Sequence, residues 1–534
     1  MKSSGLAKAA AVLAAVALLS KLTGFVRELV LANFFGTTQA MDAFIVAFTI
    51  PDLLGTLVKL GLITAFIPVY SSCLADSPAK AGKMANTLLL ISLVVLSVVV
   101  VIGAVLAKPL VSLMAPGFSQ EAQALAASLT GIIFPIVAIS GVVGVLCGIQ
   151  QVHQVFLYPA LAYPVWSVTL IAIVCAFSGQ AGIYAAAYAV IAGGILQLAV
   201  QCPGLIRCNY RFRWQFDFTR SEVGRVALLV VPALTGIAAN NICLFIDRIF
   251  ASSLAVGSIS ILNYAVQVNN VFIGLFITPL TTVLYPTLAR HYAAGDIESY
   301  KRYLNTSIRL IAFIITPVML FLMVFRRQVV EVLFRRGAFD SQAVEMTALV
   351  LMFFTVGMLG MALLDLLNQS FFAQQITIVP VLVSGAIILI NICLNFILVG
   401  PLAQGGPALA TAIAITLGTG MLAHMLRQRL GKIGGWRIVR SIAKILPAAG
   451  VMITAGIIGH GAISQYLQAY LTGWWASAWS LVGAAAVCGL VYAGVAFVLK
   501  SEEIAMILDL IAAKTTDAGP GRWRMLVRGG GERL

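Results

Sequence analysis

Long stretches without charged residues constrain this chain more than any other feature of its sequence. No Asp, Glu, Lys or Arg occurs in residues 122–206, 249–289, 366–426 or 445–499. A helix needs about 20 apolar residues to cross the hydrocarbon core of a bilayer, so the first stretch alone accommodates three spans. The stretches therefore predict an all-α polytopic membrane protein.

The overall composition excludes the other broad classes. Hydrophobic residues make up 61% of the chain and charged residues 10%, whereas soluble domains have about 45–50% and about 25%. So few charges cannot cover a water-soluble surface, and so apolar a chain is not disordered. The eight cysteines form no CxxC pair and the four histidines lack ligand spacing, so we expect neither a metal nor another cofactor. A coupling ion is left open.

Apolar segments separated by turns or charged residues predict about fourteen transmembrane helices. They are expected near residues 8–32, 40–70, 86–107, 123–150, 157–177, 182–204, 226–253, 259–289, 307–325, 342–372, 376–400, 406–426, 445–466 and 475–499. Several are interrupted by proline, as at Pro51, Pro135 and Pro279. Interrupted helices are typical of a bundle that encloses a cavity, because the freed backbone groups need protein or water as partners.

The placement of Lys and Arg predicts the orientation in the membrane. Most of the 34 basic residues fall in alternate loops and in the tail after residue 500. Cytoplasmic loops carry such an excess, so we expect both termini in the cytoplasm. The net charge of +15 then faces anionic lipid headgroups, and a nucleic-acid partner is not expected.

The first two expected helices recur later in the chain. At an offset of 221 residues, the equivalent pairs are Arg27 and Arg248, Gly36 and Gly257, Thr37 and Ser258, and Asp42 and Asn263. Six helices precede the second copy, which predicts two parallel six-helix lobes. The expected domains are an N-terminal lobe at 1–220, a C-terminal lobe at 221–440, two further helices at 441–500 and a cytoplasmic tail at 501–534.

Charges inside the expected spans are the candidate functional residues, because such charges are costly in lipid and face cavities. The first helix carries Lys21, Arg27 and Glu28. Its net charge is positive and arginine binds phosphate oxygens bidentately, so Lys21 and Arg27 are candidates for a phosphate site. Snorkelling to the membrane interface is the alternative for Arg27. Lys21 and Glu28 lie seven residues apart on one helix face, and so do Asp52 and Lys59, so each pair is either a set of ligands or an internal ion pair.

Four motifs resemble one family. SKLTGFVRELVLANFFGTTQAMDAFIVAFTIPDLL at 20–54, APGF at 115–118, GSISILNYA at 257–265 and LFRRGAFD at 333–340 are similar to the MurJ (MviN) family. These proteins are the lipid II flippases of the multidrug/oligosaccharidyl-lipid/polysaccharide exporter superfamily. The resemblance implies two six-helix lobes around a central cavity, with the last two helices forming a groove for the polyprenyl tail. It also implies cavity arginines that meet the pyrophosphate-linked headgroup, and a multi-pass location in the bacterial cytoplasmic (inner) membrane.

Carried over residue by residue, the resemblance gives a candidate site. Arg27 matches one family arginine of the first helix, Lys21 replaces the other, and Asp42 matches the acidic position that opens the second helix. Gly55 and Gln267 stand where the family has two further arginines. Lys59 and Arg248 are the nearby residues that could supply the missing charge. The substrate-binding set is therefore Lys21, Arg27, Asp42, Lys59, Arg248 and Gln267.

The expected function is translocation of an undecaprenyl-pyrophosphate-linked peptidoglycan precursor, lipid II, from the inner to the outer leaflet by alternating access. The partner is thus a polyprenyl-pyrophosphate-linked glycolipid, and we expect a monomer.

A flippase for another polyprenyl-linked oligosaccharide is one alternative. A MATE-like drug/cation antiporter is a second, although it would need an acidic first helix. An enzyme is not expected, because the short outer loops near 108–122 and 326–341 cannot hold a catalytic domain and no hydrolase or metal motif occurs. A purely structural scaffold is the remaining alternative.

Overall fold

The computed structural model describes residues 3–214, 224, 226, 242–470 and 473–506. These ranges are helical throughout except for short connections, and no strand occurs in them. The helices are α1 (Ser3–Phe35), α2 (Gln39–Asp76), α3 (Pro78–Val105), α4 (Ala107–Met114), α5 (Gln120–Ile133), α6 (Ile136–Val152), α7 (Leu157–Ala181), α8 (Tyr184–Arg207), α10 (Ser258–Ala293), α11 (Ile297–Val324), α12 (Arg326–Phe334), α13 (Ser341–Val356), α14 (Met358–Ala373), α15 (Ile378–Leu402), α16 (Gly405–Leu430), α17 (Gly435–Gln468) and α18 (Trp474–Val498). A further helical segment covers residues 242–251.

Within the described residues, eleven helices are long and apolar enough to cross a membrane, or twelve if the pair α13 and α14 counts as one span. The all-α membrane fold expected from the charge-free stretches is confirmed, whereas the count of fourteen stays a prediction. The helix expected at 226–253 lies partly outside the described residues. The same holds for the tail expected at 501–534, of which residues 501–506 are described.

Two expected helices are broken in the structure. The helix expected at 123–150 is α5 followed by α6, and the break falls at Phe134 and Pro135. Proline lacks a backbone N–H and clashes with the preceding turn, which explains this break. The helix expected at 342–372 is α13 followed by α14, with Gly357 between them.

The two outer loops expected near 108–122 and 326–341 each contain a short helix. Ala107–Met114 forms α4 and Arg326–Phe334 forms α12. Both helices are shorter than ten residues, far below the length of a span. A search for long apolar segments therefore passes over them.

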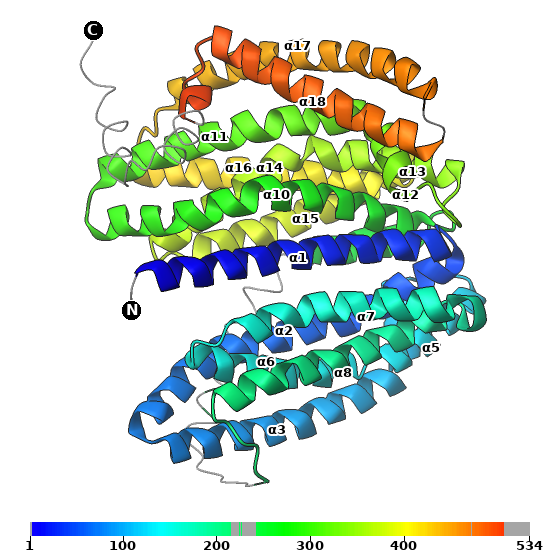
Figure 1. Ribbon diagram of the computed structural model, residues 1–534, viewed down its shortest axis with the longest axis vertical. Coiled ribbons are helices and arrows are strands. Elements are labelled where there is room, and N and C mark those ends of the chain that lie inside the picture. The colour runs from blue at the N-terminus through cyan, green and yellow to red at the C-terminus, as the bar shows by residue number, and fades with distance from the viewer. Residues whose placement is uncertain (1–2, 215–223, 225, 227–241, 471–472, 507–534) are drawn as a thin grey trace. The chain divides into compact units, whose positions relative to one another are not determined.

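The chain packs into two compact units. Unit 1 comprises residues 1–271, 333–354 and 381–414, and unit 2 comprises residues 272–332, 355–380 and 415–534. In unit 1, α2 packs on α6 and α5, α7 packs on α8 and α1, and α6 also packs on α8 (Figure 1). The aromatic side chains of Phe66 and Tyr70 are buried together with Leu88 and Ile149 between α2, α3 and α6.

Unit 2 is organised around α11. This helix packs on α14 and on α17, and α17 lies against α18 along most of its length (Figure 1). The last two helices thus form a hairpin, α17–α18, whose main packing partner is α11.

Apolar side chains cover surfaces that would face water in a soluble protein. On α3 alone, Val94, Val98, Val101 and Val105 are 53–75% exposed. Contiguous exposed apolar surface of this kind marks contact with lipid or another protein. Together with the helix lengths, it indicates a surface built for the bilayer.

Candidate functional site

Arg27 is buried in unit 1 beside its sequence neighbour Glu28. Its Nη2 and Nε donate to Glu28 Oε1 at 2.6 and 3.2 Å, and the exposed fractions of the two residues are only 8% and 5%. The guanidinium carbon lies 4.7 Å from the ring centroid of Trp166 and 6.0 Å from that of Tyr163. These two residues of α7 give the cation an aromatic face, which favours a desolvated positive charge.

Arg248, the equivalent of Arg27 in the repeat, reaches the same group of side chains. Its Nη1 donates to Thr49 Oγ1 at 2.6 Å and its Nη2 donates to Asn263 Oδ1 at 3.2 Å. Asn263 Nδ2 in turn donates to Glu28 Oε2 at 3.2 Å. We call Arg27, Glu28, Thr49, Arg248 and Asn263 the guanidinium network. It joins α1, α2, the segment 242–251 and α10 within unit 1.

The guanidinium network contains two cations and one carboxylate. Further charges near it belong to Asp247, which directly precedes Arg248, and to Asp52 and Lys59 on α2. Neither Asp52 nor Lys59 makes an ion pair within the described residues, so the internal pair left open by their spacing is not formed here. Asp52 is exposed, and the charges of Arg27, Arg248 and Lys59 act on its carboxylate. Carboxylates therefore surround the two guanidinium groups, and the site is a cluster of mixed charge in an apolar protein.

The structure brings some of the predicted site residues together and leaves others apart. Arg27 and Arg248 meet in the guanidinium network. Gln267 is half-buried on α10, one turn after Asn263 and on the same helix face. Lys59 is half-buried, and α6 approaches its backbone closely at Gly144. Lys21 is exposed on α1, almost two turns before Arg27.

Gly55 is a packing position. A Cβ atom at this residue would lie 2.9 Å from Ser140 Oγ on α6. A side chain as long as arginine would therefore run into α6. The close packing of α2 on α6 gives a physical reason for glycine at this position.

Asp42 is bound to the first turn of α10. Its Oδ2 accepts from the backbone N–H of Gly257 at 2.7 Å, and its Oδ1 accepts from the backbone N–H and the hydroxyl of Ser260 at 2.8 and 2.7 Å. A carboxylate at a helix N-terminus meets unpaired N–H groups and the positive end of the helix dipole. Gly257 has a φ of +91° and approaches Thr37 O so closely that a Cβ atom would lie 2.4 Å from it. Asp42 thus fastens α2 to α10 in this structure.

A third buried carboxylate, Asp247, precedes Arg248. Its Oδ1 accepts from the amides of Asn391 at 3.1 Å and Asn395 at 2.9 Å, and its Oδ2 accepts from Thr411. The amide oxygens of Asn391 and Asn395 are buried without a donor, and oxygen atoms of this kind suit hard cations. Within the described residues, no group of three or more His, Cys, Asp or Glu side chains could hold a metal ion.

Sequence reasoning missed the neutral members of the guanidinium network. Thr49 and Asn263 are ordinary polar residues in apolar helices, and Glu28 was considered as an offsetting charge or as a partner of Lys21. The pairing of Asp42 with Asn263 in the repeat was the one signal that drew attention to Asn263. Trp166 and Tyr163 carry no signal, because aromatic residues are common in membrane helices.

Helices of membrane-spanning length and a buried cluster of charged side chains in unit 1 define this chain as a polytopic helical membrane protein with a polar interior site. The profile of the lipid II flippase MurJ family matches residues 31–478. The chain belongs to this family.

Individual relatives agree with this assignment. A protein of Burkholderia cenocepacia named lipid II flippase MurJ is 30% identical over 84% of this chain and 88% of its own length. A probable lipid II flippase MurJ of Treponema pallidum is 28% identical over 85% of this chain and 87% of its own length.

Solved structures support the fold. A lipid II flippase MurJ in an inward closed conformation has a TM-score of 0.77 at 22% identity and covers 91% of this chain and 98% of its own. An inward-facing multidrug resistance MATE family transporter of the MOP superfamily has a TM-score of 0.65 at 14% identity, over 79% of this chain and 98% of its own. At these identities the likeness concerns the fold alone, and it agrees with the superfamily expected from the sequence.

Proposed function

We propose that this protein is a lipid II flippase, which moves an undecaprenyl-pyrophosphate-linked peptidoglycan precursor from the inner to the outer leaflet of the bacterial cytoplasmic membrane. It belongs to a family whose named members are lipid II flippases. The observation that carries the proposal is the guanidinium network. One arginine binds the buried carboxylate of Glu28 directly, and its repeat equivalent is linked to the same carboxylate through Asn263. Such intramembrane charge is kept where a charged substrate passes.

In this proposal the pyrophosphate takes hydrogen bonds from Arg248 first. Both of its hydrogen-bonded nitrogens donate to neutral oxygens, those of Thr49 and Asn263. Exchanging them for phosphate oxygens breaks no ion pair and forms charge-assisted bonds, which are roughly twice as strong. Arg27 keeps its charge over Trp166 and adds attraction for the same anion. Lys21, Lys59 and Gln267 are proposed as outlying contacts of the headgroup.

Alternating access needs a contact that closes one side of the cavity. We assign this role to the three hydrogen bonds that Asp42 accepts from Gly257 and Ser260, in place of direct binding of the headgroup. The proposed lobes are residues 1–220 and 221–440. The two last helices, at 441–500, are proposed to hold the polyprenyl tail, with a cytoplasmic tail at 501–534.

The proposed orientation has both termini in the cytoplasm. It rests on the excess of Lys and Arg in alternate loops, which would meet anionic headgroups of the inner leaflet. We propose a monomer, with no cofactor. If transport is coupled to an ion, the oxygen atoms around Asp247 are where we would place it.

A flippase for another polyprenyl-linked oligosaccharide is the second candidate. It is favoured by Gly55 and Gln267, which replace two family arginines with uncharged residues. A MATE-like antiporter of drugs is less favoured, because the guanidinium network carries more positive than negative charge and suits an anion.

The experiment is depletion of this protein in its own host. Lipid II exposed on the outer leaflet is measured by its susceptibility to an externally added lipid II-cleaving enzyme. The proposal expects exposure to fall on depletion and to return with the wild-type gene. If exposure is unchanged while another polyprenyl-linked oligosaccharide accumulates inside, the second candidate is correct.

A further inference from the structure

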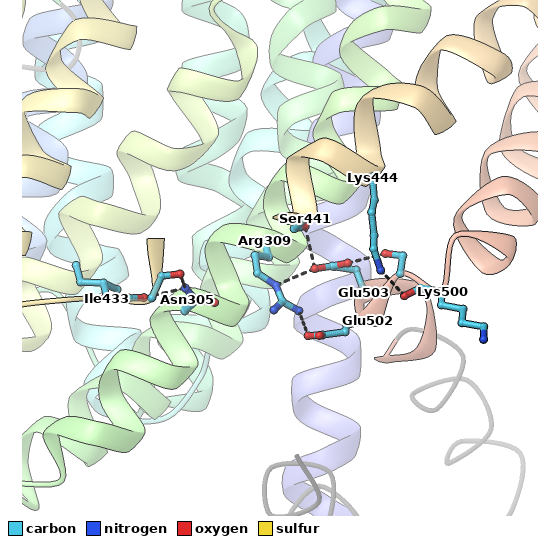
Figure 2. Close-up of polar contacts among 10 residues, drawn as sticks. Asn305, Arg309, Ile433, Ser441, Lys444, Lys500, Glu502 and Glu503 are labelled. Carbon is cyan, nitrogen blue, oxygen red and sulfur yellow. Dashed lines mark hydrogen bonds and ion pairs between the residues drawn. The ribbon is translucent and has the colours of Figure 1, made fainter. Parts of the chain in front are cut away.

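A buried ion pair fastens the segment that follows α18 to α11. Arg309 on α11 is 4% exposed, and Glu503, just beyond α18, is 2% exposed. Arg309 Nε donates to Glu503 Oε1 at 2.7 Å, and its Nη2 donates to Glu502 Oε2 at 2.7 Å (Figure 2). Ser441 on α17 donates to the same Oε1 of Glu503 at 2.9 Å. We call Arg309, Ser441, Glu502 and Glu503 the C-terminal latch.

The C-terminal latch joins three elements at one level of unit 2. Arg309 belongs to α11, Ser441 to α17, and the two glutamates follow α18. Lys444 on α17 also donates to the backbone oxygen of Lys500 at 2.8 Å. Figure 2 shows these side chains converging between the three elements.

One turn earlier, α11 binds the segment that leads into α17. Asn305 lies four residues before Arg309, on the same helix face. Its Nδ2 donates to the backbone oxygens of Ile433 and Gly434, at 2.8 and 3.0 Å (Figure 2). Successive turns of α11 therefore bind both the entry into α17 and the exit from α18.

Elsewhere the hairpin contacts α11 through neutral groups. Tyr492 on α18 donates to the backbone oxygen of Phe313 at 2.8 Å, and His460 on α17 packs edge-on against Phe325, with ring centroids 5.5 Å apart. Within the described residues, no other ion pair joins α11 to this hairpin. The C-terminal latch is thus the charged and directional part of the contact.

A buried ion pair is a poor way to gain stability alone, because desolvation of both charges offsets much of their attraction. The ion pair instead fixes the position of the hairpin along α11, since a buried charge without its partner is costly. Sliding α17–α18 along α11 by one turn would strand both Arg309 and Glu503. The latch therefore favours a single register of the hairpin on α11.

We propose that Arg309 is a positioning residue, which through the C-terminal latch fixes the α17–α18 hairpin on α11 and so places the surface that holds the polyprenyl chain. The inference rests on the proposed function for its consequence in transport, and on the contacts alone for the docking of the hairpin. The proposed effect concerns binding of the polyprenyl chain and not binding of the headgroup. Loss of the latch should therefore weaken the use of long-chain substrates and spare short-chain ones.

The two glutamates provide a matched pair of variants. Both contact Arg309 at 2.7 Å, but the side chain of Glu502 is 67% exposed and that of Glu503 is 3% exposed. Glu503→Gln should break the latch, whereas Glu502→Gln, whose charge is screened by solvent, should leave it intact. Both changes keep the size of the side chain. Lys301→Met, which removes an ion pair with Glu298 on α11 itself, controls for loss of charge on that helix.

The first measurement reports whether the α17–α18 hairpin stays packed on α11. It uses the labelling rate of a cysteine placed in the packed face of α17. Ala448 is 1% exposed and lies seven residues after Ser441 on the same face. Peptide-resolved maleimide labelling of Ala448→Cys in purified full-length protein should be slow alone and with Glu502→Gln. It should be about tenfold faster with Glu503→Gln, the effect of losing one buried charged partner.

The second measurement is transport in liposomes. The substrates are lipid-linked precursors that carry either an undecaprenyl or a short prenyl chain. Glu503→Gln should raise KM for the undecaprenyl substrate about tenfold and leave the short-chain KM unchanged, while general misfolding would reduce both kcat values alike. Arg309→Lys should have a KM for the undecaprenyl substrate between those of wild type and Glu503→Gln, because the charge remains but the forked geometry is lost.

Equal labelling of Ala448→Cys in Glu503→Gln and Glu502→Gln would overturn the latch itself. Faster labelling with no dependence on chain length would overturn its role in placing the polyprenyl chain. If wild type moves neither precursor, the proposed function fails, and the labelling result still decides whether the latch exists.

Discussion

Asn263 donates a hydrogen bond of 3.2 Å to Glu28, and this bond joins two arginines from equivalent positions of the repeat into one network. Arg27 is held by an ionic partner and Arg248 by neutral ones. The two guanidinium groups therefore differ in how readily they can turn to an incoming anion. The predictions below separate these roles from each other and from folding.

The first prediction concerns Arg27 and Glu28 as a pair. Arg27→Gln alone leaves Glu28 buried without its ionic partner, and breaking a buried pair in this way costs about 3–5 kcal/mol. Loss of transport in that variant would therefore be mixed with loss of stability. Arg27→Gln/Glu28→Gln removes both charges, and we expect it to unfold close to the wild-type temperature in detergent but to lose transport. Normal transport by the double variant would contradict a phosphate-binding role for Arg27.

Arg248 gives the second prediction. Arg248→Gln should lower the transport rate by about tenfold or more, because charge-assisted bonds to phosphate are lost. Gln267→Arg, one turn from Asn263 on α10, should restore part of the rate if charge in this region is what matters. A rate that is unchanged by Arg248→Gln would remove Arg248 from the site, whatever Gln267→Arg does.

The third prediction tests the contact between α2 and α10. In Asp42→Asn, the amide nitrogen would face donors that now bind a carboxylate oxygen, and an unsatisfied buried group costs about 1–3 kcal/mol. We expect a lower midpoint of thermal unfolding and reduced transport. Asp76→Asn, at the exposed far end of α2, is the matched control and should change stability by less than about 0.5 kcal/mol. Equal effects of the two variants would show that Asp42 has no special role.

Lys21 is the subject of the fourth prediction. Its side chain is exposed on α1 and its position is one where the family has arginine. Lys21→Arg should therefore support full growth of a strain that depends on this protein, whereas Lys21→Glu should not, because it reverses the charge near the guanidinium network. Failure of Lys21→Arg at normal abundance would indicate a substrate or geometry that differs from the family's.

The fifth prediction is a pH dependence of the C-terminal latch. Burial raises the pKa of Glu503, but hydrogen bonds from Ser501 and Ser441 and the charge of Arg309 outweigh it, so the pKa lies below its ordinary value. A carboxyl with a lowered pKa adds stability that is complete above the ordinary glutamate pKa of about 4.3 and is lost as the pH falls below it. Labelling of Ala448→Cys, measured after acid pulses, should stay slow from neutral pH to about pH 5 and rise only in stronger acid. A rise already between pH 7 and 6 would assign the dependence to another group.

The membrane-spanning helices could be predicted closely, because the length of an apolar segment is enough to identify a transmembrane helix. The helices expected at 157–177 and 475–499 are Leu157–Ala181 and Trp474–Val498 in the structure. Short amphipathic helices such as α4 have no such signal. The break at Phe134 and Pro135 could be suspected from the proline, but whether a proline bends a membrane helix or ends it depends on the packing around it.

The site was only partly predictable, because its partners lie far apart in the chain. Arg27 and Arg248 could be singled out as charges in apolar surroundings, and the repeat paired them. Glu28 and Asn263 are separated by 235 positions, and Arg309 and Glu503 by 194. Nothing local to Arg309 in the sequence indicates a buried partner. Tertiary packing decides these pairs, and no helical periodicity encodes them.

The most direct test of the account is translocation of a fluorescent undecaprenyl-pyrophosphate-linked precursor in proteoliposomes. Wild type, Arg27→Gln/Glu28→Gln and Arg248→Gln are compared at equal reconstituted amounts, with quenching from outside reporting the leaflet of each precursor. We predict that wild type equilibrates the precursor between leaflets and that both variants leave it where it was inserted. Translocation by the neutral double variant at the wild-type rate would contradict the claim that the guanidinium network carries the pyrophosphate across the membrane.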